Sequence, residues 1–258
     1  MPFIDGPSGP LECLVNGSGD PVTMFAHGFA GSISETRPFG SGVVGLRVFF
    51  HFRGHGESGD GPAPWNYASL AADVACVATT YEVNRGVGVS IGAGALLRAA
   101  LERPAFERLV LVLPPAVDRP RTGRAVDRVE SMAQRADEGD VEGLTELLLN
   151  EQPADVRDRR VVQMWARGQA QRLVTPPLRE VIRRVPAEHP VEDRTALKAV
   201  ACPVLLIGQE GDEAHPSSVV HELAEALPDA RMQIFSAGGV LWNHRGEVRQ
   251  LISGFLND

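Results

Sequence analysis

The chain has 258 residues, of which 43% are hydrophobic, and a formal net charge of −8. This length suits one α/β domain with an insertion, and the negative charge argues against binding to the phosphates of nucleic acids. No apolar run reaches the roughly 20 residues that span a bilayer, so no membrane association is expected. The opening residues, MPFIDGPSGPLE, lack the charged start and apolar centre of a signal peptide, which predicts a cytoplasmic protein.

The cysteines Cys13, Cys76 and Cys202 are scattered along the chain. No two of them have the spacing of metal ligands, so buried free thiols in a reducing compartment are expected. No metal site is therefore predicted. The expected partner is a small-molecule substrate, with the protein acting as a monomer or a homodimer.

Short apolar or β-branched runs alternate along the chain with helical patterns. The runs are nearly continuous, which is typical of parallel strands covered on both faces. The predicted strands are Pro21–Ala26, Val43–Phe52, Gly86–Val89, Leu109–Leu113, Val204–Ile207 and Met232–Phe235. The predicted helices are Tyr67–Tyr81, Ile91–Glu102, Ser217–Leu227 and about 245–256. This alternation predicts an α/β protein with a doubly wound, mostly parallel sheet.

One segment interrupts this alternation. About 90 residues between Leu113 and Pro203 contain no convincing strand, and a structureless loop of that length is uncommon in a compact domain. Helical patterns fill the segment instead, at about 122–138, 141–150, 154–172 and 178–185. We therefore predict a helical cap over residues 115–200, inserted into a core formed by residues 1–114 and 201–258.

Residues 88–92, GVSIG, follow a predicted strand and precede a predicted helix. In that setting G-x-S-x-G is typical of a nucleophile elbow, in which a strained turn exposes the serine hydroxyl. Glycines at 88 and 92 avoid collisions with neighbouring elements, and the helix N-terminus adds positive potential beside a developing oxyanion. Ser90 is therefore the candidate nucleophile.

Two more polar turns follow predicted strands, at the edge where parallel sheets bind ligands. HGFAGS, residues 27–32, places a histidine–glycine pair after the first of these strands. Phe29 in this turn and Ile91 after the serine are candidates to donate backbone N–H groups to an oxyanion. His27 is predicted to hold the loop at the border of the substrate pocket. His55, in RGHGESG, is predicted to pin the next turn or to line the pocket.

The turn after Val204–Ile207 reads GQEGDEAHP. Asp212 in this turn is the candidate carboxylate that orients an imidazole. Asp118, which follows the strand before the predicted cap, is the alternative. His215 stands next to a proline and is predicted to be structural.

Together these motifs resemble those of the α/β-hydrolase-fold superfamily. HGFAGS is similar to its oxyanion loop, GVSIG to its nucleophile elbow and GQEGDEAHP to its acid turn, in the family's order. The resemblance extends from about Asp20 onward and is closest to the capped esterases, enol-lactonases and cofactor-free haloperoxidase-like enzymes. It implies Ser90 as the nucleophile and Asp212 as the acid. It also implies oxyanion donors at Phe29 and Ile91, and no metal or organic cofactor.

The family's histidine normally follows the last strand, and alignment of the last helix puts Gly239 at that place. His244, five residues later, is the candidate base if the last helix begins late or swings inward, because five helical residues span about 7.5 Å. The alternatives are that the base is lost, or that another histidine or a water network replaces it. Three further histidines are predicted to be too remote or too exposed for this role, namely His51, His189 and His221.

The expected function is a serine hydrolase acting on an ester, lactone or thioester of a small to medium, partly apolar molecule. Met132, Trp165 and Trp242 are predicted to border its substrate pocket. The arginines of the cap are expected to form a solvated face paired with acids rather than to select an anionic substrate. Two rival functions remain, a degenerate hydrolase fold that binds a small ligand and a non-hydrolytic enzyme such as a cyclase or lyase.

Overall fold

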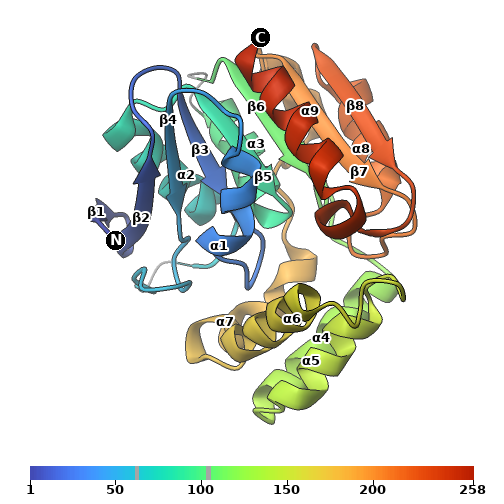
Figure 1. Ribbon diagram of the computed structural model, residues 1–258. Helices are drawn as coiled ribbons and strands as arrows, with labels where there is room; N and C mark the ends of the chain where they lie inside the picture. The colour runs from blue at the N-terminus through green and yellow to red at the C-terminus, as the bar shows by residue number, and fades with distance from the viewer. Residues whose placement is uncertain (62–63, 103–105) are drawn as a thin grey trace.

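The computed structural model describes residues 1–61, 64–102 and 106–258. Its centre is an eight-stranded sheet with the strand order β1-β2-β4-β3-β5-β6-β7-β8. Strands β1 and β2 pair antiparallel, as do β2 and β4, and every pair from β4 to β8 is parallel (Figure 1). The strands are β1 Phe3–Gly6, β2 Gly9–Asn16, β3 Val22–Ala26, β4 Leu46–Phe50, β5 Arg85–Val89, β6 Arg108–Val112, β7 Val204–Gln209 and β8 Ala230–Phe235.

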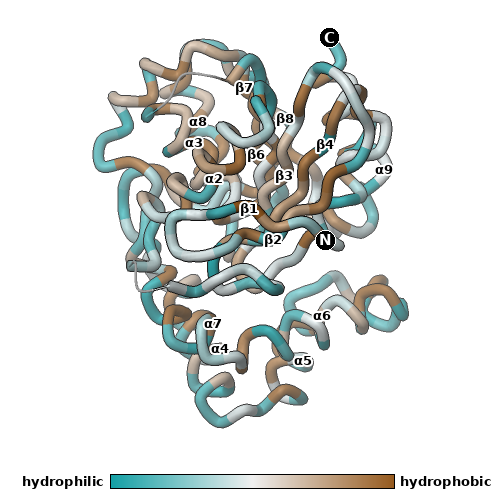
Figure 2. The backbone as a smooth tube through the Cα atoms, turned by 90° about the vertical axis from the view of Figure 1, so that its left-hand side faces the viewer, coloured by the Kyte–Doolittle hydropathy of each residue, from teal (hydrophilic) through white to brown (hydrophobic). Residues whose placement is uncertain are grey.

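Helices cover both faces of this sheet. Helices α2 (Tyr67–Tyr81), α3 (Ile91–Glu102) and α8 (Ser217–Ala226) pack on one face in a single apolar cluster. Helix α9 (Arg245–Asn257) packs on the other face together with the short segments α1 (Ile33–Thr36) and η1 (Arg37–Gly40). Strands β3, β5, β6 and β7 are consequently buried along most of their lengths, and Figure 2 shows hydrophobic segments along the strands of the sheet.

The predicted doubly wound, mostly parallel sheet is confirmed. Five of the predicted strands differ from β3, β5, β6, β7 and β8 only at their ends. The predicted strand Val43–Phe52 is shorter, because Gly45 has a φ of 81° and the strand begins after it. Strands β1 and β2 were not predicted. Strand β1 has only four residues, β2 begins with glycine and proline, and both lie at the antiparallel edge of the sheet.

The segment between β6 and β7 is helical. It contains α4 (Arg124–Asp137), α5 (Val141–Asn150), α6 (Arg160–Leu173), α7 (Pro176–Val181), η2 (Ile182–Ala187) and η3 (Arg194–Ala199). Helices α4 to α7 share an apolar cluster of their own and lie beyond one end of the sheet (Figure 1). Helix α7 begins at Pro176, because proline suits the first helical turn. The domain boundaries at 115 and 200 stay a prediction.

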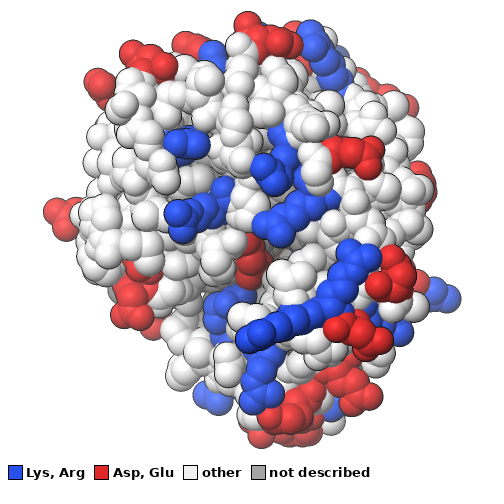
Figure 3. Space-filling model, in the orientation of Figure 1, with Lys and Arg blue, Asp and Glu red and all other residues white. Residues whose placement is uncertain are grey.

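Arginines of these helices pair with acids on their surface. Figure 3 shows basic and acidic side chains beside each other over the lower part of the molecule, where α4 and α5 lie in Figure 1. Among the pairs are Arg128 with Glu151, Arg135 with Asp140, and Arg183 with Glu130 and Asp137. None of the described helices is long and apolar enough to cross a bilayer.

A buried ion pair joins the turn after β4 to helix α2. The Arg53 guanidinium donates to both carboxylate oxygens of Asp73, at 2.9 Å from Nε and 2.7 Å from Nη2. Both side chains are almost fully inaccessible to solvent. The pair therefore holds the turn that follows β4 against the helical layer.

We expect Asp73→Ala to lower the free energy of unfolding by about 3–5 kcal/mol, because it leaves the buried Arg53 charge without its partner. Urea denaturation of both proteins measures the difference. Asp60→Ala, which removes an exposed acid from the neighbouring loop, is the matched control and should change stability little. A loss in Asp73→Ala no larger than in the control would contradict this account.

Candidate active site

Ser90 stands at the sharp turn between β5 and α3. Its φ is 52°, in the left-handed region that non-glycine residues rarely adopt, as expected for a strained elbow. A Cβ added at Gly88 would lie 2.5 Å from the Gly92 carbonyl carbon, and one at Gly92 would lie 2.7 Å from that of Ala26. The two glycines therefore allow the turn to pack closely against the helix start and strand β3.

A histidine of the acid turn contacts this serine. His215 Nε2 lies 2.9 Å from Ser90 Oγ, and His215 Nδ1 lies 3.0 Å from Asp212 Oδ2. The backbone amides of Ala214 and His215 donate to Asp212 Oδ1 at 2.9 and 3.0 Å. The three side chains thus form one hydrogen-bonded chain from the loop after β7 to the elbow after β5.

The same contacts keep the carboxyl group ionised. Burial raises the pKa of Asp212, but the adjoining His215 ring and the two backbone amides outweigh it and lower this pKa to about 2. An ionised Asp212 accepts a hydrogen bond from Nδ1–H of His215, which leaves Nε2 as an acceptor toward the Ser90 hydroxyl.

The two residues predicted to donate to an oxyanion lie near Ser90. Phe29 and Ile91 both line the cavity that contains the serine hydroxyl. Among the described residues, neither N–H group donates to a protein acceptor; that of Ile91 opens helix α3, where helical acceptors are lacking. The loop lies close to the elbow, since a Cβ at Gly28 would be 3.4 Å from Ser90 Cβ.

Three buried histidines hold the loop that carries Phe29. His55 Nε2 accepts from the Ala30 amide at 3.1 Å, and His51 Nε2 accepts from the Ile33 amide at 3.0 Å. His27 accepts from the Phe52 amide at 3.2 Å, and its Nδ1 lies 2.7 Å from the Gly28 carbonyl oxygen. Each ring uses one nitrogen as an acceptor, a role that only the neutral imidazole can fill.

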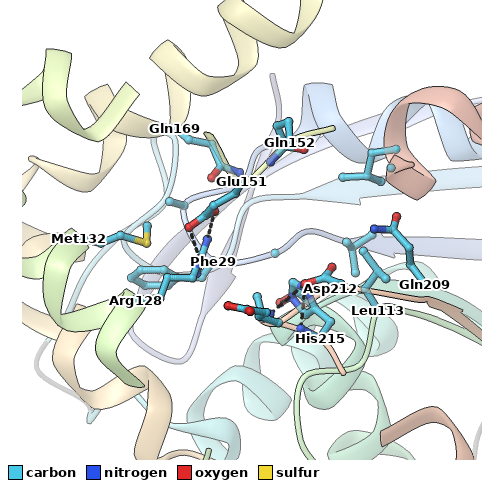
Figure 4. Close-up of a pocket in the computed structure, with 18 of the residues that line it drawn as sticks. Phe29, Leu113, Arg128, Met132, Glu151, Gln152, Gln169, Gln209, Asp212 and His215 are labelled. Carbon is cyan, nitrogen blue, oxygen red and sulfur yellow. Dashed lines mark hydrogen bonds and ion pairs between the residues drawn. The ribbon is translucent and has the colours of Figure 1, made fainter. Parts of the chain in front are cut away.

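A cavity of about 630 Å³ lies over Ser90, between the sheet edge and the helical segment. Figure 4 shows Asp212 and His215 on one side of it and Met132, Arg128 and Glu151 on the other. The predicted pocket residues Met132, Trp165 and Trp242 all line it. The Trp165 and Trp242 rings pack edge to face with their centroids 5.5 Å apart. Trp242 Nε1 also donates a hydrogen bond to Gln152 Oε1 at 2.8 Å.

His244, the predicted base, is not at Ser90. Its Nδ1 faces Glu247 at 3.3 Å, its Nε2 faces Ser236 at 3.4 Å, and its ring lies against Phe235. A single π-helical turn, η4 (Gly239–Asn243), separates it from the end of β8 and sends Trp242 rather than a histidine toward the cavity. The geometry therefore replaces His244 with His215 as the imidazole next to the serine.

The loop after β8 has little room for a side chain at position 239. Gly239 lines the cavity with a φ of 84°, and a Cβ there would lie 2.7 Å from Trp242 Cδ1. Substitution of this glycine would therefore strain the backbone and displace the tryptophan.

Two other predictions are corrected. His27 does not line the cavity; it is fully buried beneath the loop, where its hydrogen bonds hold the backbone. Asp118, the alternative acid, forms a bidentate pair with Arg194 at 2.7 and 2.6 Å and is not bonded to His215. His215 was missed as a site residue because Pro216 beside it indicated a structural role. Its position three residues after the candidate acid was the signal that could have found it.

A family model described as the alpha/beta hydrolase family matches residues 14–250. The chain belongs to the alpha/beta hydrolase family. The predicted resemblance is thus confirmed for nearly the whole chain. A search of curated protein sequences finds no match.

Solved structures share the fold of this family member over its whole length. An enol-lactonase from Burkholderia xenovorans LB400 is 20% identical with a TM-score of 0.83, covering 100% of both chains. Rv0554 from Mycobacterium tuberculosis is 23% identical with a TM-score of 0.78, covering 99% of this chain and 98% of the other. An esterase from Exiguobacterium antarcticum is 18% identical with a TM-score of 0.75, covering 99% of each chain.

The buried histidines predict acid sensitivity. Burial disfavours the imidazolium, so the pKa values of His27 and His51 are lowered from 6.5 and that of His55 falls to about 3. Below pH 6.5 the unfolded chain therefore binds protons that the folded chain does not. We expect the free energy of unfolding to fall as pH falls below 6.5, by up to about 1.4 kcal/mol per pH unit for each strongly shifted histidine.

Urea denaturation between pH 8 and pH 5 measures this dependence. The slope of the free energy of unfolding against pH should be smaller in His55→Gln, which removes one of the three buried histidines. It should be unchanged in His221→Gln, which removes an exposed histidine of α8. Equal slopes in wild type and His55→Gln would show that this histidine does not carry the effect.

Proposed function

We propose that the protein is a serine hydrolase that cleaves an ester, lactone or thioester of a small to medium, partly apolar molecule. The observation that carries this proposal is the hydrogen-bonded chain Asp212–His215–Ser90 at the floor of the cavity. The 2.9 Å between His215 Nε2 and Ser90 Oγ is a distance over which a base can take the hydroxyl proton. Because one fold hosts many reactions, the proposal rests on this site and not on the family alone.

In the first half of the reaction, Ser90 Oγ attacks the substrate carbonyl carbon while His215 Nε2 accepts the hydroxyl proton. Negative charge develops on the carbonyl oxygen, which the N–H groups of Phe29 and Ile91 stabilise. The intermediate then collapses, the bond from the carbonyl carbon to the leaving oxygen or sulfur breaks, and His215 protonates the leaving atom. Ser90 now carries the acyl group.

Water completes the cycle. His215 takes a proton from a water molecule whose oxygen attacks the acyl carbon, and the new intermediate expels Ser90 Oγ. The serine recovers its proton from His215, and the carboxylic acid leaves. Throughout, the ionised Asp212 holds the imidazole in the tautomer with Nδ1 protonated. With a lactone the leaving hydroxyl stays in the same molecule, and the product is a hydroxy acid.

The observation that favoured the two rival functions has another explanation. A ligand-binding degenerate fold and a non-hydrolytic enzyme were both favoured by the lack of a histidine after the last strand. His215 places an imidazole beside Ser90 from a different loop. A strained serine with a base within hydrogen-bond distance serves covalent catalysis, whereas simple binding has no need of it.

Labelling of the active serine with a fluorophosphonate probe, read by intact mass, tests the proposal. Wild type should take up one label, and Ser90→Ala should take up none. His215→Ala should label about 10³-fold more slowly or worse, because the hydroxyl then lacks its base. His244→Ala, the matched histidine control, should label at the wild-type rate. Absence of labelling in folded wild type would reject the proposal, and rapid labelling of His215→Ala would reject the assigned base.

Arg172 of helix α6 supports the oxyanion loop from the cap side. Its Nε donates to the Ala30 carbonyl oxygen at 2.6 Å, and its Nη2 pairs with Glu35 at 2.6 Å. Ala30 itself has a φ of 52° and follows Phe29 directly. The guanidinium therefore fixes the backbone next to the N–H group that the mechanism needs.

We expect Arg172→Met to slow hydrolysis of 4-nitrophenyl acetate about 10-fold to 100-fold in kcat, since misplacing an oxyanion donor costs part of what removing it costs. Arg167→Met is the control, because Arg167 is an exposed residue of the same helix that pairs with Glu142. The two variants should differ in kcat although both lose one charge. Equal kcat values would show that the Arg172 contact does not position the loop.

A further inference from the structure

The charged groups around the cavity are almost all paired within the protein. Four acidic side chains line it, and each has a basic partner. The pairs are Glu35 with Arg172, Glu151 with Arg128, Asp212 with His215 and Glu213 with Arg124. Figure 4 shows one of them, Arg128 and Glu151, on the cap side of the cavity. One charged side chain that lines the cavity has no ion-pair partner among the described residues.

That side chain is Arg121, in the loop between β6 and α4. It lines the cavity, and its Nε atom is buried without a hydrogen-bond partner within the described ranges of the chain. No carboxylate among those same residues lies within ion-pair distance of it; Asp212 attracts it only at longer range. Arg121 is partly buried, with its Nε atom inaccessible to solvent. A cation shielded in this way without a carboxylate is costly, and a partner from outside the protein removes that cost.

The surroundings hold Arg121 in place without neutralising it. Its backbone N–H donates to the Pro186 carbonyl oxygen at 2.8 Å, which ties the loop to η2. The Tyr67 hydroxyl interacts with the Arg121 side chain, but it is buried, and burial raises the Tyr67 pKa to about 12, so this polar neighbour stays uncharged. Arg128 repels it, and burial lowers the pKa of Arg121, although a guanidinium remains charged at neutral pH.

We propose that Arg121 binds a carboxylate of the substrate, so that the enzyme acts on esters or lactones that carry a second, ionised carboxyl group. This inference rests on the proposed hydrolase function and adds the substrate class. A guanidinium pairs with a carboxylate through two parallel N–H···O bonds, which also orients the bound molecule. The second carboxylate would lie against the loop after β6 while the ester carbonyl lies at Ser90, since both residues line the same cavity.

A matched pair of substrates tests this proposal. The anionic substrates are the mono-4-nitrophenyl esters of succinate, glutarate and adipate, and the neutral ones are the same molecules with the free carboxyl methylated. Wild type should favour at least one anionic ester by about 10-fold to 100-fold in kcat/KM, the range typical of a charge-assisted hydrogen bond. Arg121→Gln should lose that preference without losing hydrolysis of the neutral esters.

Arg119→Gln is the matched control, because it removes an exposed arginine two residues away that pairs with Glu222. It should keep the wild-type preference. The proposal is overturned if wild type does not discriminate between the two kinds of ester, or if Arg121→Gln discriminates as wild type does. Fluorophosphonate labelling of Arg121→Gln at the wild-type rate would show that its Ser90 is intact.

Binding without chemistry separates this proposal from the hydrolase function. Calorimetric titration with succinate, glutarate and adipate should give binding of at least one dicarboxylate to wild type and to Ser90→Ala. Arg121→Gln should bind it at least about 10-fold more weakly. If Ser90 is not labelled but this difference holds, the hydrolase function fails and the anion site stands. If Ser90 is labelled and no dicarboxylate binds, the anion site fails and the hydrolase function stands.

Discussion

The hydrogen bond between His215 Nε2 and Ser90 Oγ joins two loops that are far apart in the sequence. These loops follow β7 and β5, and β6 lies between the two strands. The bond forms because parallel strands bring their carboxyl ends to one edge of the sheet. The positive φ of Ser90 raises its hydroxyl above the sheet end. The proposed chemistry depends on this meeting point, and both residues line the cavity together with Phe29 and Ile91.

Placing acid and imidazole three residues apart in one turn changes the role of the loop after β8. That loop no longer has to deliver a histidine, and it forms the π-helical turn of η4 instead. Trp242 of this turn packs against Trp165 and donates to Gln152, both in the segment between β6 and β7. The loop thereby becomes a wall of the cavity and a contact between the core and the inserted helices. Short π turns are rare and often lie at functional sites.

The sequence was sufficient to predict the fold but only part of the candidate site. Continuous apolar runs identify buried parallel strands, and the glycines around Ser90 identify the elbow, because both signals are local. The histidine that lies next to Ser90 cannot be identified from local sequence patterns. Its position depends on the loop geometry around Gly211, which has a φ of 73°, and on Pro216, which precedes α8. His244 lies in the expected region, but the turn of η4 directs it away from the cavity, and the alignment through Gly239 could not reveal that.

The position of Ala30 explains how the helical segment can influence chemistry on the sheet. On the side of the core, His55 accepts a hydrogen bond from the Ala30 N–H group. On the opposite side, Arg172 of α6 donates a hydrogen bond to the Ala30 carbonyl oxygen. One peptide segment is therefore held by a neutral buried histidine and by a cation that Glu35 partly neutralises. A movement of α6 would shift this backbone and with it the adjoining Phe29 N–H group. The inserted helices thus contact the predicted oxyanion loop as well as forming part of the wall of the cavity, and Arg172 makes that contact.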